Sequence, residues 1–221
     1  RTYGPAVLPE NMKESGDVSW AKLPSGIAYL YVRRCKDDLP ERVDDALAEL
    51  ADAPGLILDF RGNSGGGFDH DALMGRFVPA GSELAFSKRY ASAGPHPYAG
   101  PVVVIVDGSV VSAAETGSGM FKEDGRALLI GESATAGMSS SKETVDLPSG
   151  KYSLYVSVSS NMGRFNDGKG IEGIGVIPQL RLEFDPEDLA AGQDTLIRRA
   201  EALLGEAAAG KGPWKDVPYR L

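Results

Sequence analysis

Apolar and polar residues follow one another in blocks along this chain, and the blocks predict strands and helices. Residues 27–34 (IAYLYVRR) are rich in β-branched and aromatic side chains, which is typical of a strand. A helical pattern then opens at Pro40, and apolar residues recur at helical spacing at Val43, Leu47 and Leu50.

Three short apolar runs predict strands that are buried on both faces: residues 56–60, 102–107 and 127–131. The segments 69–78 and 112–123 between them read as helices. Strands that alternate with helices in this way predict an α/β fold around a mostly parallel sheet.

The pattern changes in the second half of the chain. Residues 142–148 and 152–159 predict a β-hairpin around a Pro-Ser-Gly turn, and the strict alternation of KYSLYVSVS is typical of a half-exposed strand. Residues 160–172 are rich in Gly, Asn and Asp and predict a long loop, and leucines and alanines at helical spacing predict a closing helix from Leu189 to Leu204.

These elements fit one core domain at residues 25–206, with an irregular lead-in at 1–24 and an irregular tail at 207–221. The chain has 221 residues, of which 42% are hydrophobic, and no apolar run approaches the roughly 18–20 residues that span a bilayer. Its net charge of −8 argues against nucleic acid or an anionic membrane as the main partner. The single cysteine, Cys35, is expected to be a buried free thiol.

Two loops of small residues come directly after predicted buried strands, where α/β proteins place their ligands. The first, RGNSGGG at 61–67, lets backbone N–H groups approach a ligand closely because glycine has no Cβ. It is either a tight turn or an anion-binding nest, and it lacks the spacing of phosphate-binding and dinucleotide-binding loops.

The second loop ends at Ser112, where a helix is expected to begin. Ser112 with Glu115 three residues later fits a helix-capping box. The same position also suits a nucleophile whose oxyanion is held by the N–H of Ala113 at the positive end of the helix.

Three motifs in order carry a resemblance to a known family: D-x-R-G-N-x-G-G at 59–66, S-A-x-E at 112–115 and E-G-x-G-V-x-P at 172–178. Together they resemble the tail-specific, or C-terminal-processing, serine peptidases of family S41. The resemblance implies a ClpP/crotonase-like core, with a mostly parallel sheet, flanking helices and a small added β-hairpin.

Carried over residue by residue, the resemblance implies that Ser112 is the nucleophile. The N–H of Ala113 and that of Gly65 or Gly66 would form the oxyanion hole, which is worth about 3 kcal/mol per donor. Asn63 and Glu115 are expected to support these loops.

A serine nucleophile needs a base, and the family uses two types. One type has a lysine about 25 residues after the serine, where this chain has Gly137 and where Lys142 is the nearest lysine. The other, tricorn-like type has a Ser–His–Glu arrangement with a glutamate some sixty residues after the serine, which Glu172 matches.

The histidine of that arrangement is expected upstream of Arg1, and His70 is the alternative within the chain. The second histidine, His96, lies between prolines in a predicted surface loop.

Other functions stay open at this point. The chain fits a catalytically inactive binding module of the same fold or, less well, a crotonase-type acyl-CoA enzyme. A metal site at Asp69, His70 and Asp71 is disfavoured because adjacent helical side chains point in different directions. The resemblance implies a protein or peptide substrate, no metal or organic cofactor and an extracytoplasmic location, and no PDZ module for tail selectivity is recognised.

Overall fold

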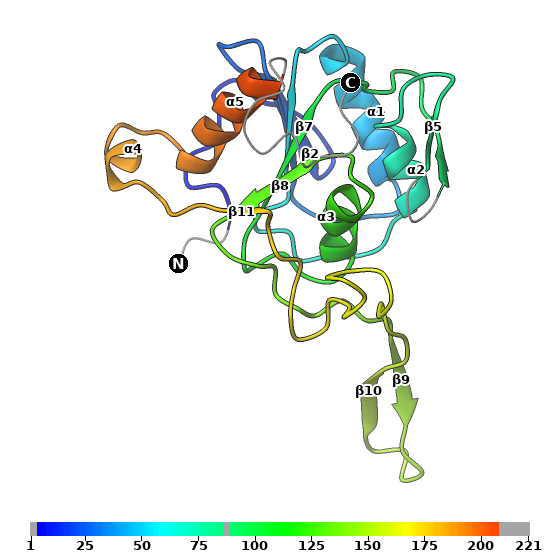
Figure 1. Cartoon of the computed structure of the whole chain (residues 1–221). Helices are drawn as coiled ribbons and strands as arrows, with labels where there is room; N and C mark the ends of the chain where they lie inside the picture. The colour runs from blue at the N-terminus through cyan, green and yellow to red at the C-terminus, as the bar shows by residue number, and fades with distance from the viewer. Residues whose placement is uncertain (1–3, 86–88, 208–221) are drawn as a thin grey trace.

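The computed structural model describes residues 4–85 and 89–207, and its centre is a seven-stranded sheet with the order β1-β2-β3-β4-β7-β8-β11. Within it, β3, β4, β7, β8 and β11 run parallel, whereas β1 and β2 extend the sheet as antiparallel strands (Figure 1). The bounds are β1 Lys13–Ser15, β2 Val18–Lys22, β3 Ala28–Val32, β4 Leu56–Asp59, β7 Val102–Val106, β8 Leu128–Gly131 and β11 Leu180–Arg181.

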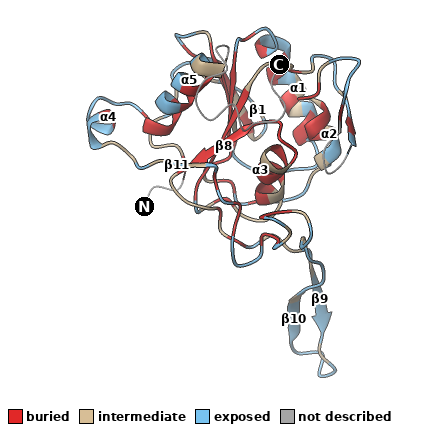
Figure 2. Ribbon diagram, viewed as in Figure 1, coloured by how far each residue is buried: buried red, intermediate tan, exposed pale blue. Residues whose placement is uncertain are grey.

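Helices cover both faces of this sheet (Figure 1). Alternate strand residues such as Leu58 and Val104 pack in the core that holds α1, α2 and α3, whereas Ile57 and Val103 pack against α5. Because both faces are covered, β4 and β7 are buried throughout, as their apolar sequences predict (Figure 2). The helices are α1 Leu39–Leu50, α2 His70–Gly75, α3 Ala113–Glu123, α4 Pro186–Ala190 and α5 Thr195–Ala207.

Two hairpins lie outside the central sheet. One joins β5 Glu83–Ala85 to β6 Arg89–Ala91, and the other joins β9 Lys142–Asp146 to β10 Ser153–Ser157. The β9–β10 hairpin projects from the body of the molecule, and both of its faces are largely exposed (Figures 1 and 2). The prediction of a half-exposed strand was therefore wrong, because no other element covers either face within the described residues.

The α/β fold class with a mostly parallel sheet is confirmed, and so are the buried strands and the helices between them. The irregular lead-in was a wrong prediction, since β1 and β2 lie within residues 1–24. Their alternation covers too few residues to be recognised alone, and pairing with β3 makes them strands.

The closing helix was also predicted too simply. Instead of one helix there are two, α4 and α5, and the segment between them includes Gly192 at φ +70°. The predicted tail lies outside the described residues except for Ala207, which ends α5. Cys35 is a buried free thiol, as expected. Among the described residues, no helix has the length and apolar character to cross a membrane.

The sheet core should carry most of the stability. We expect Leu58→Ala to lower the free energy of unfolding by about 2–5 kcal/mol, because Leu58 is fully buried in β4 and its removal leaves a cavity. Leu154→Ala is the matched control, since Leu154 is 50% exposed on the β9–β10 hairpin and should change stability by less than about 0.5 kcal/mol. Urea denaturation measures both, and equal losses would contradict this assignment of the core.

Candidate active site

Ser112 lies at the turn between β7 and α3, beyond the carboxyl end of a central parallel strand. Its backbone has φ 59° and ψ −125°, a conformation that residues with a side chain rarely adopt. Strain of this kind costs about 1–3 kcal/mol and persists only where the surroundings impose it.

The carboxylate of Glu115 supplies that constraint. Glu115 is fully buried, and its Oε2 accepts from the N–H of Ser112 at 3.0 Å and of Met138 at 2.8 Å. Its Oε1 accepts from Thr135 Oγ1 at 2.6 Å and from the Gly137 N–H at 2.7 Å. One carboxylate therefore ties the serine turn to the loop at residues 135–138.

The helix-capping interpretation of Ser112 holds only in part. Glu115 reaches back to the Ser112 N–H, as in a capping box, but the Glu115 N–H donates to the main-chain carbonyl of Ser112 at 2.9 Å. Ser112 and Glu115 are arranged as in a capping box, but among the described residues the serine side chain makes no hydrogen bond that caps α3. The hydroxyl is thus left available for another role.

The glycine loop packs directly against the serine turn. A Cβ at Gly65 would lie 2.7 Å from the Cβ of Ser112 and 3.4 Å from the nitrogen of Ala113, and one at Gly66 would overlap the carbonyl oxygen of Cys35 at 1.8 Å. Both glycines also have positive φ, 84° and 133°. Only glycine fits this approach without moving the backbone.

Asn63 fixes the loop from inside. Its side-chain amide donates to the carbonyl of Val32 at 2.8 Å, and its Oδ1 accepts from the N–H of Gly65 at 2.9 Å. The Gly65 N–H is thereby engaged. In contrast, no acceptor within the described residues takes the N–H of Gly66 or that of Ala113.

Arg61 anchors the same loop to α5 on the other face of the sheet. Its guanidinium contacts Asp59 at 2.7 Å and Asp194 at 2.9 Å, and all three side chains are buried. Asp194 also accepts from the N–H of Leu196 at 3.0 Å and of Ile197 at 3.1 Å at the start of α5. Burial raises the pKa of Asp59, although Arg61 acts in the opposite direction.

A cavity of about 480 Å³ opens beside Ser112. Gly66, Ala113, His70, Lys142 and Tyr155 are among the residues that line it with Ser112. The structure therefore brings together residues from the glycine loop, α2, the start of α3 and the β9–β10 hairpin. Among the described residues, the lining includes no aspartate or glutamate.

His70 shares this cavity, yet no hydrogen bond joins it to Ser112 among the described residues. Its Nε2 lies 2.7 Å from Thr116 Oγ1, and its ring stacks on Phe68 at 4.1 Å. Burial lowers the pKa of His70 below 6.5, and the charge of Arg164 lowers it further. The ring is therefore neutral at pH 7, the protonation state that a base requires.

Two further predicted residues, Glu172 and His96, are not among those that line the cavity. Glu172 is exposed, and its Oε2 accepts from the Ser139 N–H at 3.1 Å, while the Ser139 hydroxyl donates to the carbonyl of Ser112 at 3.0 Å. His96 is exposed and does not line the cavity.

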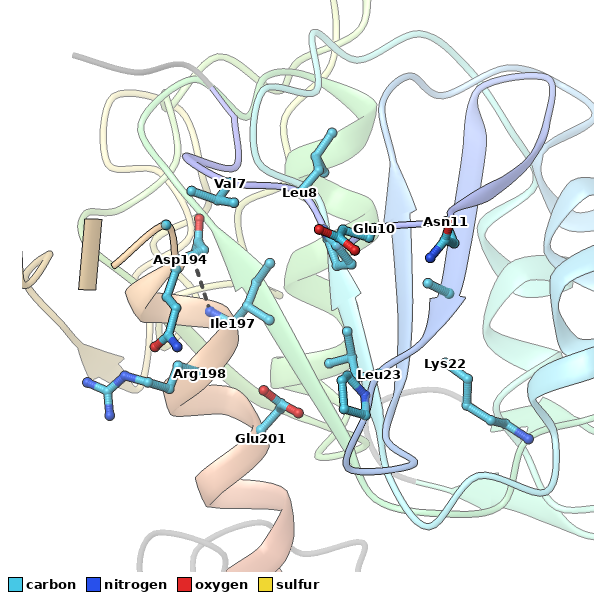
Figure 3. A pocket seen from close by; sticks show the side chains of 15 residues that line it. Val7, Leu8, Glu10, Asn11, Lys22, Leu23, Asp194, Ile197, Arg198 and Glu201 are labelled. Carbon is cyan, nitrogen blue, oxygen red and sulfur yellow. Dashed lines mark hydrogen bonds between the residues drawn. The ribbon is translucent and has the colours of Figure 1, made fainter. Parts of the chain in front are cut away.

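A second hollow of about 730 Å³ lies on the α5 side of the sheet (Figure 3). The lead-in, the turn between β2 and β3, and α5 line it, and none of the predicted site residues is among them. Asp194 is among the residues that line this hollow, and its ion pair with Arg61 connects the hollow to the glycine loop.

Comparison with known proteins assigns the family. The model of peptidase family S41 matches residues 26–182, which is more than half of the chain. The chain belongs to peptidase family S41. The matched range includes the glycine loop and Ser112, which follow the adjacent strands β4 and β7.

A C-terminal processing peptidase is among the relatives of this chain. A chloroplastic C-terminal processing peptidase from Tetradesmus obliquus is 28% identical over 220 residues, covering 92% of this chain and 45% of that protein. The chain thus spans less than half the length of this relative.

Solved structures show the same fold. A candidate peptidase from Parabacteroides merdae has a TM-score of 0.71 at 21% identity, covering 91% of this chain and 71% of that chain. The tricorn protease has a TM-score of 0.63 at 22% identity, covering 81% of this chain and 18% of that chain.

Replacing the buried carboxylate should loosen the serine turn. We expect Glu115→Gln to lower the free energy of unfolding by about 2–4 kcal/mol, because the amide NH₂ would face an N–H donor and leave it unsatisfied. Hydrogen exchange at Gly137 and Met138 should accelerate as well. Glu143→Gln on the exposed hairpin is the control, and an effect no larger than that of the control would contradict the role of Glu115.

Proposed function

We propose that this chain carries the catalytic core of a serine peptidase that cleaves peptide bonds through an acyl-enzyme on Ser112. The observation that carries the proposal is the strained Ser112 turn beside two unengaged N–H groups, those of Gly66 and Ala113. Two such donors near a serine hydroxyl are the elements of an oxyanion hole. Family membership supports a peptide or protein as the substrate.

The proposed reaction has two halves. The Ser112 hydroxyl attacks the peptide carbonyl while a base takes its proton, and the N–H groups of Ala113 and Gly66 stabilise the oxyanion by about 3 kcal/mol each. The base returns the proton to the leaving amine, which departs and leaves the acyl-enzyme. Water then attacks the acyl-enzyme with the same base, and Ser112 is regenerated.

Gly66 is favoured over Gly65 as the second donor. The Gly65 N–H already donates to Asn63 Oδ1, so using it would cost that hydrogen bond. Asn63 and Glu115 thus act as supports, since each fixes the backbone of one half of the proposed oxyanion hole.

We assign the base to His70, which shares the cavity with Ser112 and is neutral at pH 7. To accept the proton, its ring must leave Thr116 and turn toward the serine. In the tricorn-like arrangement Glu172 would orient the histidine. Here Glu172 accepts a hydrogen bond from Ser139, and the Ser139 hydroxyl donates to the carbonyl of Ser112. These two contacts support a place for Glu172 close to Ser112.

A second candidate is a peptide-binding module of the same fold that does not hydrolyse its ligand. The contact between His70 and Thr116 favours it, because the serine then has no base in hydrogen-bonding distance among the described residues.

A fluorophosphonate probe tests the nucleophile. We expect the chain to be labelled at Ser112, as located by mass spectrometry, and Ser112→Ala to abolish labelling. Ser82→Ala is the control, since Ser82 is exposed and does not line the cavity, and it should leave labelling unchanged. A folded chain that resists the probe would favour the binding module.

His70→Gln tests the base. We expect labelling to slow by about 10²–10⁴-fold, which is the usual contribution of general base catalysis. In the wild-type chain the rate should fall as pH decreases through a midpoint below 6.5, because protonation of His70 removes the base. His96→Gln is the control. Unchanged labelling in His70→Gln would refute the assignment.

A further inference from the structure

The β9–β10 hairpin contributes one wall of the cavity beside Ser112. Lys142 and Ser157 form a cross-strand pair at its base, and Thr144 and Tyr155 form the next pair on the same face. Lys142 and Tyr155 both line the cavity. An extended peptide that reaches Ser112 through this opening must therefore pass a cationic side chain.

Lys142 is held in place by hydroxyl groups. Its Nζ donates to Ser140 Oγ at 2.9 Å and to Ser157 Oγ at 3.2 Å, and the Ser140 hydroxyl donates to Ser157 Oγ at 2.8 Å. An ammonium has three N–H donors, so these contacts leave one unused. The Ser157 hydroxyl accepts in both contacts, and its own proton also remains available.

The charge of Lys142 is not neutralised by a neighbouring carboxylate within the part of the chain that the structure describes. The cavity lining contains no aspartate or glutamate, and its histidine, His70, is neutral at pH 7. Lys142 is thus the one formal charge of the lining, in a chain whose net charge is −8. A local positive site in an acidic protein favours an anionic group of a ligand over a neutral one.

We propose that Lys142 forms a subsite for a carboxylate of the peptide substrate. The unused N–H of the ammonium would donate to a carboxylate oxygen, and charge-assisted hydrogen bonds of this kind are stronger than neutral ones. Either an Asp or Glu side chain or a free C-terminal carboxylate provides this chemistry. The proposal rests on the proposed function for its ligand, a peptide, but assigns Lys142 to recognition rather than to proton transfer.

Binding to the Ser112→Ala chain tests the subsite without any need for turnover. The ligands are fluorescent hexapeptides, acetylated and amidated, in which one Glu moves through a background of Gln, together with the all-Gln peptide bearing a free C-terminal carboxylate. Fluorescence anisotropy should show about five- to tenfold tighter binding of one carboxylate peptide than of the neutral one. Preference for a peptide with an internal Glu would indicate recognition of a side chain, and preference for the all-Gln peptide with a free C-terminus would indicate recognition of the chain end.

Variants of Lys142 in the same background decide the assignment. Lys142→Met should abolish the preference, Lys142→Arg should retain it, and Lys151→Met, on the same hairpin but outside the cavity, should leave it unchanged. The absence of a preference in the parent chain, or its persistence in Lys142→Met, would overturn the proposal.

Labelling of the Ser112-containing chain separates this proposal from the proposed function. If the fluorophosphonate fails to label while the carboxylate preference depends on Lys142, the peptidase function is wrong and the subsite stands. If Lys142→Arg abolishes labelling and no carboxylate preference exists, Lys142 is the base and the subsite is refuted.

Discussion

The carboxylate of Glu115 holds the serine turn in a conformation that the turn would not adopt alone. A positive φ at a serine is unfavourable, and the hydrogen bond from the Ser112 N–H to Glu115 helps to offset that cost. The other three donors to this carboxylate come from residues 135–138, which lie 20 to 23 residues after Glu115 in the chain. A buried anion needs this many donors to replace water, so the turn and the loop must form together.

Steric fit imposes the matching constraint on the glycine loop. The loop passes so close to its neighbours that a Cβ at Gly65 would collide with Ser112 and a Cβ at Gly66 would collide with Cys35. The side chain of Asn63 then fixes the loop by bonding to β3 and to the loop itself. The serine turn and the glycine loop are thus each rigid for a different reason, hydrogen bonding in one and close packing in the other.

The sequence predicts the parts of this arrangement that depend on local pattern. Continuous apolar runs identify β4 and β7, and glycine and serine after those strands mark the site, because the carboxyl ends of parallel strands meet at one edge. It does not predict contacts set by long-range folding. The sequence around Thr135 does not indicate that its hydroxyl donates to Glu115. Nor does the sequence around Thr116 indicate its contact with His70. The exposed β9–β10 hairpin has the alternation of a half-buried strand, so pattern alone misjudges its surroundings.

The distribution of charge connects the buried contacts to the cavity. Three buried carboxylates near the site are satisfied inside the protein: Glu115 by four donors, and Asp59 and Asp194 by Arg61. Charges neutralised in this way project little negative potential outward, although the chain as a whole carries a net charge of −8. What faces the cavity is instead a set of N–H and O–H donors and one ammonium. Such a surface favours groups that are negative or become negative, which is the same physical requirement for the proposed oxyanion at Ser112 and for the proposed carboxylate at Lys142.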